Sequence, residues 1–300
     1  MKVAVTGATG TIGRPLVRAL RQRGDEVRVL SRDPSRASKT LGVEAFAWNP
    51  VGDPPPAEAL EDCNGVIHLA GETLAQRWSD AARHRIFASR ELGTRNLVAG
   101  LRDAGPRMRV LVSQSAVGWY GPHGDERLDE SAPAGEDFEA TVVTAWEHEA
   151  HKADELGVRV AITRTGVVLS KEGGALARML PPFKLGVGGP VAGGQQYVSW
   201  IHEDDVVGAL LLCLDDDEAS GPINVTAPEP VTNAELSKAL GRVLHRPAFM
   251  PVPAFAVRLL YGEMASIVTT GKRAIPKRLT ELGYEFEYTE VEAALRAALT

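Results

Sequence analysis

The sequence contains little of what several classes of protein require. Its 300 residues include only two cysteines, Cys63 and Cys213. Two are too few for a disulfide framework, and their mostly apolar surroundings are typical of buried thiols in a reducing compartment. No stretch approaches the roughly 20 uninterrupted apolar residues of a membrane span. The amino terminus lacks the charged and then apolar design of a secretion signal. We therefore expect a cytoplasmic protein with no membrane partner.

Positive charge is scarce as well. Lys and Arg number 33 against 39 Asp and Glu, which gives a formal net charge of -6. The cations are scattered rather than clustered, so the chain has no electrostatic footprint for nucleic acid. Its length suits one large domain or a domain with a smaller appendage. We expect a small-molecule substrate, no nucleic-acid partner, and a monomer or homodimer.

The first thirteen residues carry the most specific motif of the chain. Residues 3–5 form a short apolar run, and glycines follow in a T-G-x-x-G-x-x-G arrangement before apolar residues resume at helical spacing. A buried strand that turns through glycines into a helix N-terminus brings free N–H groups against a pyrophosphate. The motif therefore predicts a dinucleotide site formed by Gly7, Thr9, Gly10, Thr11, Ile12 and Gly13.

The end of the second predicted strand, residues 26–30, indicates which dinucleotide binds. An acidic residue there would bind a free ribose 2′-hydroxyl and favour NAD. This chain has Ser31 and Arg32, and a guanidinium can hold a 2′-phosphate with two hydrogen bonds. Asp33 competes as a ribose ligand, but it falls one residue later. The sequence therefore predicts NADP as the cofactor.

Strand-like and helical segments alternate through the first half of the chain. The strand-like runs are VAVT, EVRVL, AFAW, GVIHLAG, RVLVSQS and VRVAITR, with helical patterns near 14–23, 34–41, 79–103 and 139–156. This alternation predicts an α/β fold with a Rossmann-like, doubly wound parallel sheet. We expect an NADP-binding domain over 1–170 that also receives parts of 199–230, and a smaller substrate-side region over 171–300. Glycines and prolines crowd 173–194, which predicts a loop-rich segment over a binding cleft.

These motifs resemble the extended short-chain dehydrogenase/reductase superfamily, and the likeness covers the whole chain. GVIHLAG (65–71) resembles its fourth strand, whose end passes beside the cofactor, and LVSQSAVGWYG (111–121) resembles its fifth strand, which ends in a catalytic Ser or Thr. RTGVVLSKEGGAL (164–176) and the ending from 276 to 299 resemble an NAD(P)-dependent epimerase/dehydratase-like subgroup with a C-terminal domain of unknown function. The resemblance implies cofactor contacts at Leu69, Ala70, Gly71 and Glu72.

The proton relay of that superfamily is missing from its usual place. Redox chemistry there rests on Tyr-x-x-x-Lys, in which the Lys lowers the Tyr pKa and the phenolate moves a proton. The corresponding segment here, 138–156, contains no Tyr. Alignment on Glu147 places Glu139 at the Tyr position and Val143 at the Lys position. The resemblance therefore leaves the group that moves the proton unassigned.

Three interpretations remain open for the chemistry. Ser115 ends a central strand, where Rossmann-type sheets place ligands, so we expect it to orient the reacting oxygen. Tyr120 is the nearest phenol and is our candidate for the proton transfer, with a packing role as the alternative. An imidazole or a carboxylate can act instead, and the candidates are His202, Glu147, Asp204 and Asp205. The third interpretation is a sensor that binds NADP without turnover.

Two arginines are predicted to face the cofactor cleft. FASRELGTRNL (87–97) puts Arg90 where extended members usually carry Asn. A cation there would prefer an anion, either a cofactor phosphate or a substrate carboxylate, and the alternative is a salt bridge to Glu91 or to a neighbouring loop acid. Arg164, at the end of the sixth strand, faces the same choice. We assign no metal ligands, and expect an NADP-dependent oxidoreductase or epimerase-like enzyme whose substrate the sequence does not identify.

Overall fold

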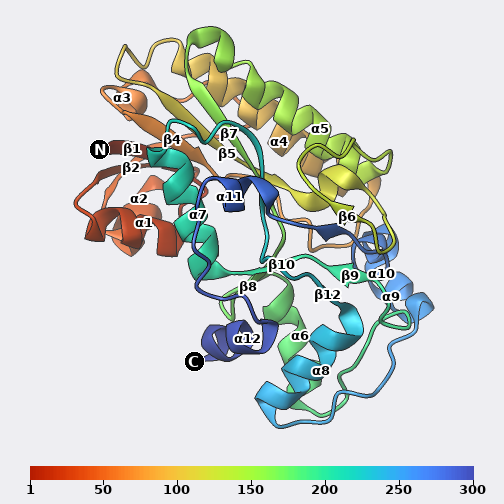
Figure 1. Ribbon diagram of the computed structural model, residues 1–300. Helices are drawn as coiled ribbons and strands as arrows, with labels where there is room; N and C mark the ends of the chain where they lie inside the picture. Colours follow the sequence, from red (N-terminus) through yellow and green to blue (C-terminus); the bar gives the residue numbers. More distant parts are fainter.

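The centre of the fold is a parallel sheet of seven strands (Figure 1). The computed structural model describes residues 1–300. The strands lie in the order β3-β2-β1-β4-β5-β7-β11. Their bounds are β1 Lys2–Thr6, β2 Glu26–Ser31, β3 Glu44–Ala47, β4 Gly65–His68, β5 Val110–Ala116, β7 Arg159–Thr165 and β11 Gly221–Val225. The strand order reverses between β1 and β4, and this switch point is where such sheets bind ligands.

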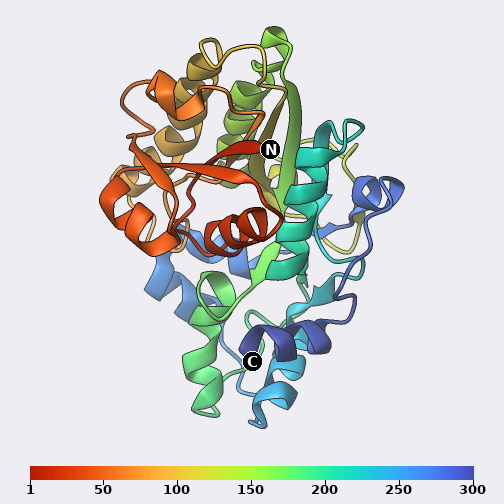
Figure 2. The same cartoon turned by 90° about the vertical axis from the view of Figure 1, so that its left-hand side faces the viewer.

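Helices cover both faces of the sheet, as a doubly wound fold requires (Figure 2). One face carries α1 (Gly13–Gln22), α2 (Pro34–Leu41) and α7 (Glu203–Asp215), and the other carries α3 (Ala57–Leu60), α4 (Asp80–Leu101) and α5 (Phe138–His151). Alternate side chains of β1 separate the two cores. Val3 and Val5 pack with α1 and α7, whereas Ala4 packs with α3 and α4. The predicted fold class is confirmed.

Most of the remaining elements form the lower part of the molecule in Figure 1 and its connections to the sheet, whereas α11 (Lys277–Glu281) lies beside α7 and packs on β11. The other helices are α6 Gly174–Lys184, α8 Asn233–Leu244, α9 Ala254–Tyr261, α10 Ala265–Thr269 and α12 Val291–Leu299. The short strands are β6 Arg127–Leu128, β8 Val167–Leu169, β9 Tyr197–Val198, β10 Trp200–His202, β12 Val231–Thr232 and β13 Arg273–Ala274. Single 3-10 turns occupy Val117–Tyr120, Asp154–Leu156 and Gly262–Met264. Helices α6, α8 and α12 share a core around the fully buried Trp200.

The loop expected over 173–194 is in part a helix. Helix α6 holds eleven residues although Pro181 and Pro182 lie inside it. Leu176, Leu180 and Phe183 recur at helical spacing and are buried, so their burial outweighs the loss of two backbone donors. The loop was predicted from the glycines and prolines alone, without regard to this apolar face.

Residues beyond 199 return to the main sheet, since β11 pairs with β7 and α7 packs on the sheet. The domain boundary at 170 stays a prediction. None of the helices combines the length and the apolar composition that a bilayer crossing requires.

Candidate functional site

The glycine-rich loop, residues 7–13, closes tightly on the end of β4. Gly7 has a φ of +66°, and a Cβ there would lie 2.6 Å from the carbonyl carbon of Leu69. A Cβ on Gly13 would lie 2.4 Å from the carbonyl oxygen of Gly7. The N–H groups of Thr11 and Ile12 make no hydrogen bond, and α1 begins without a side-chain cap. The loop therefore presents free donors at a helix N-terminus, the arrangement that binds phosphate.

A buried hydrogen-bond chain fixes the backbone that follows β4. Thr6 Oγ1 accepts the N–H groups of Leu69 and Ala70, each at 3.1 Å, and lies 2.7 Å from Nδ1 of His68. Because both lone pairs of the hydroxyl are occupied, its proton points to Nδ1. His68 Nε2 then carries the ring proton and donates it to Thr94 at 3.1 Å. Burial lowers the pKa of His68 to about 3, so this imidazole stays neutral and structural.

The residues at the end of β2 and just after it make different contacts. Asp33 caps α2, because its Oδ1 accepts the backbone N–H of Arg36 at 3.0 Å. The Ser31 hydroxyl lies 3.2 Å from the Asp33 carbonyl oxygen and also accepts the Asp33 N–H. Arg32 is exposed, and its side chain makes no hydrogen bond or ion pair within the protein. The carboxylate that competed as a ribose ligand is thus engaged, whereas the guanidinium is available.

A cavity of about 200 Å³ lies at the carboxyl ends of β5 and β7. Its walls come from these two strands, from α4 and α5, and from the segments that follow β4 and β7. The lining residues are Leu74, Trp78, Arg90, Gln114, Ser115, Ala116, Phe138, Glu139, Val142, Val143, Trp146, Thr165, Gly166 and Val168. Three of the groups weighed from the sequence, Ser115, Arg90 and Glu139, therefore share one cavity.

Arg90 is a buried cation in the cavity wall, with 8% of its surface exposed. Its Nη1 donates to the carbonyl oxygen of Glu72 at 3.0 Å, and the guanidinium carbon lies 5.1 Å from the ring centre of Trp146. A Cβ on Gly71 would lie 3.3 Å from the guanidinium carbon, so the backbone after β4 lies directly against it. Arg90 therefore stands between the backbone predicted to contact the cofactor and the cavity.

No carboxylate pairs with Arg90. Glu91, the partner weighed from the sequence, instead accepts a hydrogen bond from Arg95 at 2.7 Å. Burial lowers the pKa of Arg90 to about 10, which still leaves it charged at neutral pH. Beside it, the buried indole nitrogen of Trp146 has no hydrogen-bond partner. A cation and a free donor in one wall suit a ligand that carries an anionic or acceptor group.

Ser115 belongs to a buried polar network with α5 and β7. Its hydroxyl donates to Glu147 Oε1 at 2.5 Å. Arg164 donates to both oxygens of the same carboxylate, from Nε at 2.9 Å and from Nη2 at 2.8 Å. The Arg164 side chain is 3% exposed and paired with Glu147, which favours the salt-bridge alternative over the predicted contact with the cofactor. The hydroxyl proton of Ser115 is engaged, so its oxygen offers lone pairs to the cavity.

Tyr120 lies outside the cavity and has no exposed surface. Its hydroxyl donates to Asn224 Oδ1 at 2.7 Å and accepts from Arg164 at 3.3 Å. Burial raises the pKa of Tyr120 to about 12. Because this hydroxyl is buried and makes two hydrogen bonds within the protein, the structure favours the packing alternative for Tyr120 over proton transfer.

The alternative imidazole and carboxylates at the start of α7 are also structural. His202 Nδ1 accepts the Asp204 N–H at 3.2 Å and caps the helix, and its ring lies 4.1 Å from that of Tyr288. Asp205 accepts the N–H groups of Glu287 and Tyr288 at 2.8 and 3.1 Å. These residues hold the chain before α12 against α7, and none of them lines the cavity.

The cavity also contains residues that sequence reasoning missed. Trp78 and Phe138 line it and pack edge to face, with ring centres 5.1 Å apart. Glu139 forms an ion pair with Lys272, which comes from the C-terminal part of the chain. The only indication for Glu139 was its alignment with the missing tyrosine. No local pattern marks Lys272, because it lies 133 positions after Glu139 and only the tertiary fold brings the two residues together.

Comparison with known proteins agrees with this arrangement. The NAD dependent epimerase/dehydratase family matches residues 3–226, and a domain of unknown function, DUF1731, matches residues 252–298. An Arabidopsis thaliana relative, "Epimerase family protein SDR39U1 homolog, chloroplastic", is 42% identical in an alignment of 302 positions that covers 100% of this chain and 87% of the relative.

Two solved structures resemble the chain closely. The crystal structure of the human epimerase family protein SDR39U1 (isoform 2) with NADPH has a TM-score of 0.88 and 32% identity, and 99% of each chain is covered. A Corynebacterium glutamicum structure described as a nucleoside-diphosphate sugar epimerase has a TM-score of 0.79 and 34% identity, with 100% of this chain and 58% of that chain covered.

Proposed function

The chain belongs to the NAD dependent epimerase/dehydratase family, and on that premise we propose that it is an NADP(H)-dependent oxidoreductase or epimerase-like enzyme. Its substrate is a small molecule that enters the cavity beside Ser115. The observation that carries the cofactor assignment is the free guanidinium of Arg32 beside an Asp33 that is already engaged as a helix cap. The crystallisation of the human relative with NADPH supports the same choice.

The residues of the chain fit a dinucleotide at the switch point of the sheet. The free N–H groups of Thr11 and Ile12 would hold the pyrophosphate, since the glycines keep side chains out of its path. Arg32 would hold the 2′-phosphate with two charge-assisted hydrogen bonds. The backbone after β4, fixed by Thr6 and His68, would form the floor beneath the ribose groups.

The cavity fits the reacting end of such a ligand. Bound NADP(H) supplies or accepts a hydride, so the chain must orient the substrate and handle a proton. Ser115 would accept a hydrogen bond from a substrate hydroxyl or from the nicotinamide amide, because its own proton is donated to Glu147. Arg90 and the free indole nitrogen of Trp146 would hold an anionic or acceptor group, either of the substrate or of the cofactor.

The cofactor assignment is tested by fluorescence titration of the wild type and of Arg32→Ala with NADPH and with NADH. We expect Arg32→Ala to weaken NADPH binding by about 10- to 100-fold, the value of one bidentate contact to phosphate, and to leave NADH within about twofold. Lys39→Ala removes an exposed cation of the nearby helix α2 and serves as the matched control. An equal loss of both dinucleotides in Arg32→Ala would contradict the assignment.

Turnover is tested with NADPH and NADP over a panel of carbonyl compounds, alcohols and nucleoside-diphosphate sugars. We expect the wild type to turn over at least one class. We expect Ser115→Ala to slow that reaction by about 10- to 1,000-fold with little change in NADPH binding. Tight NADPH binding with no turnover in the panel would favour the sensor interpretation instead.

A further inference from the structure

Glu139 is the one carboxylate that lines the cavity, and it forms an ion pair with Lys272. Glu139 lies in the first turn of α5 and lines the cavity together with Ser115. Its Oε2 accepts a hydrogen bond from Lys272 Nζ, and the side chains are 11% and 9% exposed. Gly118 leaves the room that this carboxylate needs, because a Cβ there would lie 2.5 Å from Glu139 Cγ. The pair is therefore largely buried, and Glu139 faces the cavity.

The segment that carries Lys272 is fixed from both sides. The Ser199 hydroxyl donates to the Lys272 carbonyl oxygen at 2.8 Å and accepts the Ala274 N–H at 2.9 Å. A Cβ on Gly271 would lie 2.4 Å from the backbone nitrogen of Tyr197, so only glycine allows this close approach. The backbone around Lys272 is thus held against β9 and β10, and its ammonium group has a defined position.

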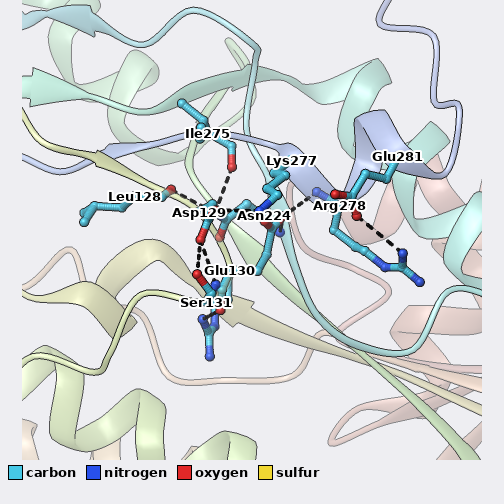
Figure 3. A network of polar contacts seen from close by, with 10 residues as sticks. Leu128, Asp129, Glu130, Ser131, Asn224, Ile275, Lys277, Arg278 and Glu281 are labelled. Atoms are coloured by element: carbon cyan, nitrogen blue, oxygen red, sulfur yellow. Dashed lines mark hydrogen bonds and ion pairs between the residues drawn. The ribbon is translucent and has the colours of Figure 1, made fainter.

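A second set of contacts anchors the same segment a few residues later (Figure 3). Strand β13 pairs with β6, and the Asn224 amide donates to the Ile275 carbonyl oxygen at 2.9 Å. Glu130 accepts the N–H groups of Asn224 and Arg278 at 2.9 and 3.0 Å, and Lys277 pairs with Asp129 at 3.0 Å. These contacts join the C-terminal segment to the loop after β6 and to the edge strand of the main sheet.

From these contacts we infer that Glu139 is the proton-transferring residue of the cavity and that Lys272 is the residue that positions it. The inference rests on the proposed function. In substrate oxidation, a Glu139 oxygen takes the hydroxyl proton while the hydride leaves the same carbinol group for the cofactor. In carbonyl reduction, Glu139 returns that proton to the oxygen. Each turnover thus moves one hydride and one proton, and Lys272 holds the carboxylate toward the cavity and balances its charge.

We expect a substitution of either Glu139 or Lys272 to change the relative affinity of the protein for NADP⁺ and NADPH. The nicotinamide ring is cationic in NADP⁺ and neutral in NADPH, so a charge near it changes their relative affinity. Glu139→Gln leaves Lys272 unbalanced, and we expect it to weaken NADP⁺ relative to NADPH by about fivefold, the scale of one unit charge across a partly buried site. Lys272→Met leaves Glu139 unbalanced, and the ratio should change by a similar factor in the opposite direction.

The controls separate this role from a purely structural one. Lys272→Arg keeps the charge and should keep the wild-type ratio, and the double variant Glu139→Gln/Lys272→Met should return near it. Glu292→Gln, in the exposed pair with Arg242, should leave the ratio unchanged. With the substrate that the wild type turns over, Glu139→Gln should lose about 100-fold or more in kcat while it still binds NADPH.

The affinity and turnover measurements together test the role of Glu139. Opposite changes of the ratio in the two single variants, with loss of turnover in Glu139→Gln, support the inference. An unchanged ratio in both variants, or full turnover by Glu139→Gln, overturns it and leaves the proposed function intact. A wild type that binds neither NADP⁺ nor NADPH contradicts the proposed function, and this inference fails with it.

Discussion

The network beneath Ser115 makes a specific prediction about stability. Glu147→Gln removes the charge of a carboxylate that is 5% exposed and accepts three hydrogen bonds, one from Ser115 and two from Arg164. Burial alone would lower the pKa of Arg164, but the hydrogen bonds and the charge of Glu147 more than offset burial and raise it. The variant therefore leaves a cation that is 3% exposed without a charged partner.

The size of the effect follows from that burial. Removing one partner of a buried ion pair costs about 3 to 5 kcal/mol, because the remaining charge stays desolvated. Domains are stable by roughly 5 to 15 kcal/mol, so this is a large share of the total. Stacking of the guanidinium on Trp119, at 3.9 Å, still supports Arg164 in the variant and places the expected loss near the lower value.

The loss is measured by urea unfolding, followed by far-UV circular dichroism. The double variant Glu147→Leu/Arg164→Met replaces both charges with apolar side chains. We expect it to be more stable than Glu147→Gln, since no buried charge is left unpaired. Glu292→Gln, at an exposed pair, should leave the unfolding free energy unchanged. A loss below about 1 kcal/mol in Glu147→Gln, or a double variant no more stable than Glu147→Gln, would refute the reasoning.

Three further predictions concern buried groups. Burial lowers the pKa of His68 in the folded chain to about 3, whereas the unfolded chain binds a proton on this residue below pH about 6.5. The free energy of unfolding should therefore fall by about 2 kcal/mol as the pH falls from about 7 to about 5. Unfolding at several pH values should show this loss in the wild type but not in His68→Gln. The thiols of Cys63 and Cys213 have pKa values raised by burial to about 11 and about 12, so a thiol reagent should label them only in denaturant, and labelling of the native protein would contradict their burial. Gly7→Ala combines a positive φ with overlap of the backbone after β4 and should cost roughly 3 kcal/mol or more, against about 1 for Gly24→Ala, where a Cβ meets nothing within 4 Å. Equal losses in these two variants would remove the argument for the close approach.

The features that the sequence predicted well are local ones. Gly7 to Gly13 form a strand-turn-helix unit whose geometry depends on neighbouring residues, and α2 begins where Asp33 and Pro34 provide a cap and a first helical residue. The capping role of Asp33 is local as well, because a helix that begins at Pro34 engages the carboxylate just before it.

The features that could not be predicted from the sequence are contacts between side chains that lie far apart in the chain. Arg164 and Tyr120 both lie near the cofactor side of the sheet. Only the packing of α5 shows that Glu147 engages Arg164, and only the pairing of β11 with β7 shows that Asn224 engages Tyr120. Lys272 lies in a segment without a motif, and its position depends on contacts made by β6, β9 and β10. Burial and partners decide which of several plausible polar residues face the cavity, and neither is encoded in local spacing.

The most direct test of the account is a crystal structure of the chain with NADP⁺ bound. We predict that the 2′-phosphate contacts Arg32, that the pyrophosphate contacts the N–H groups of Thr11 and Ile12, and that the nicotinamide enters the cavity between Ser115 and Glu139. A 2′-phosphate directed away from Arg32, or a nicotinamide outside this cavity, would contradict the account.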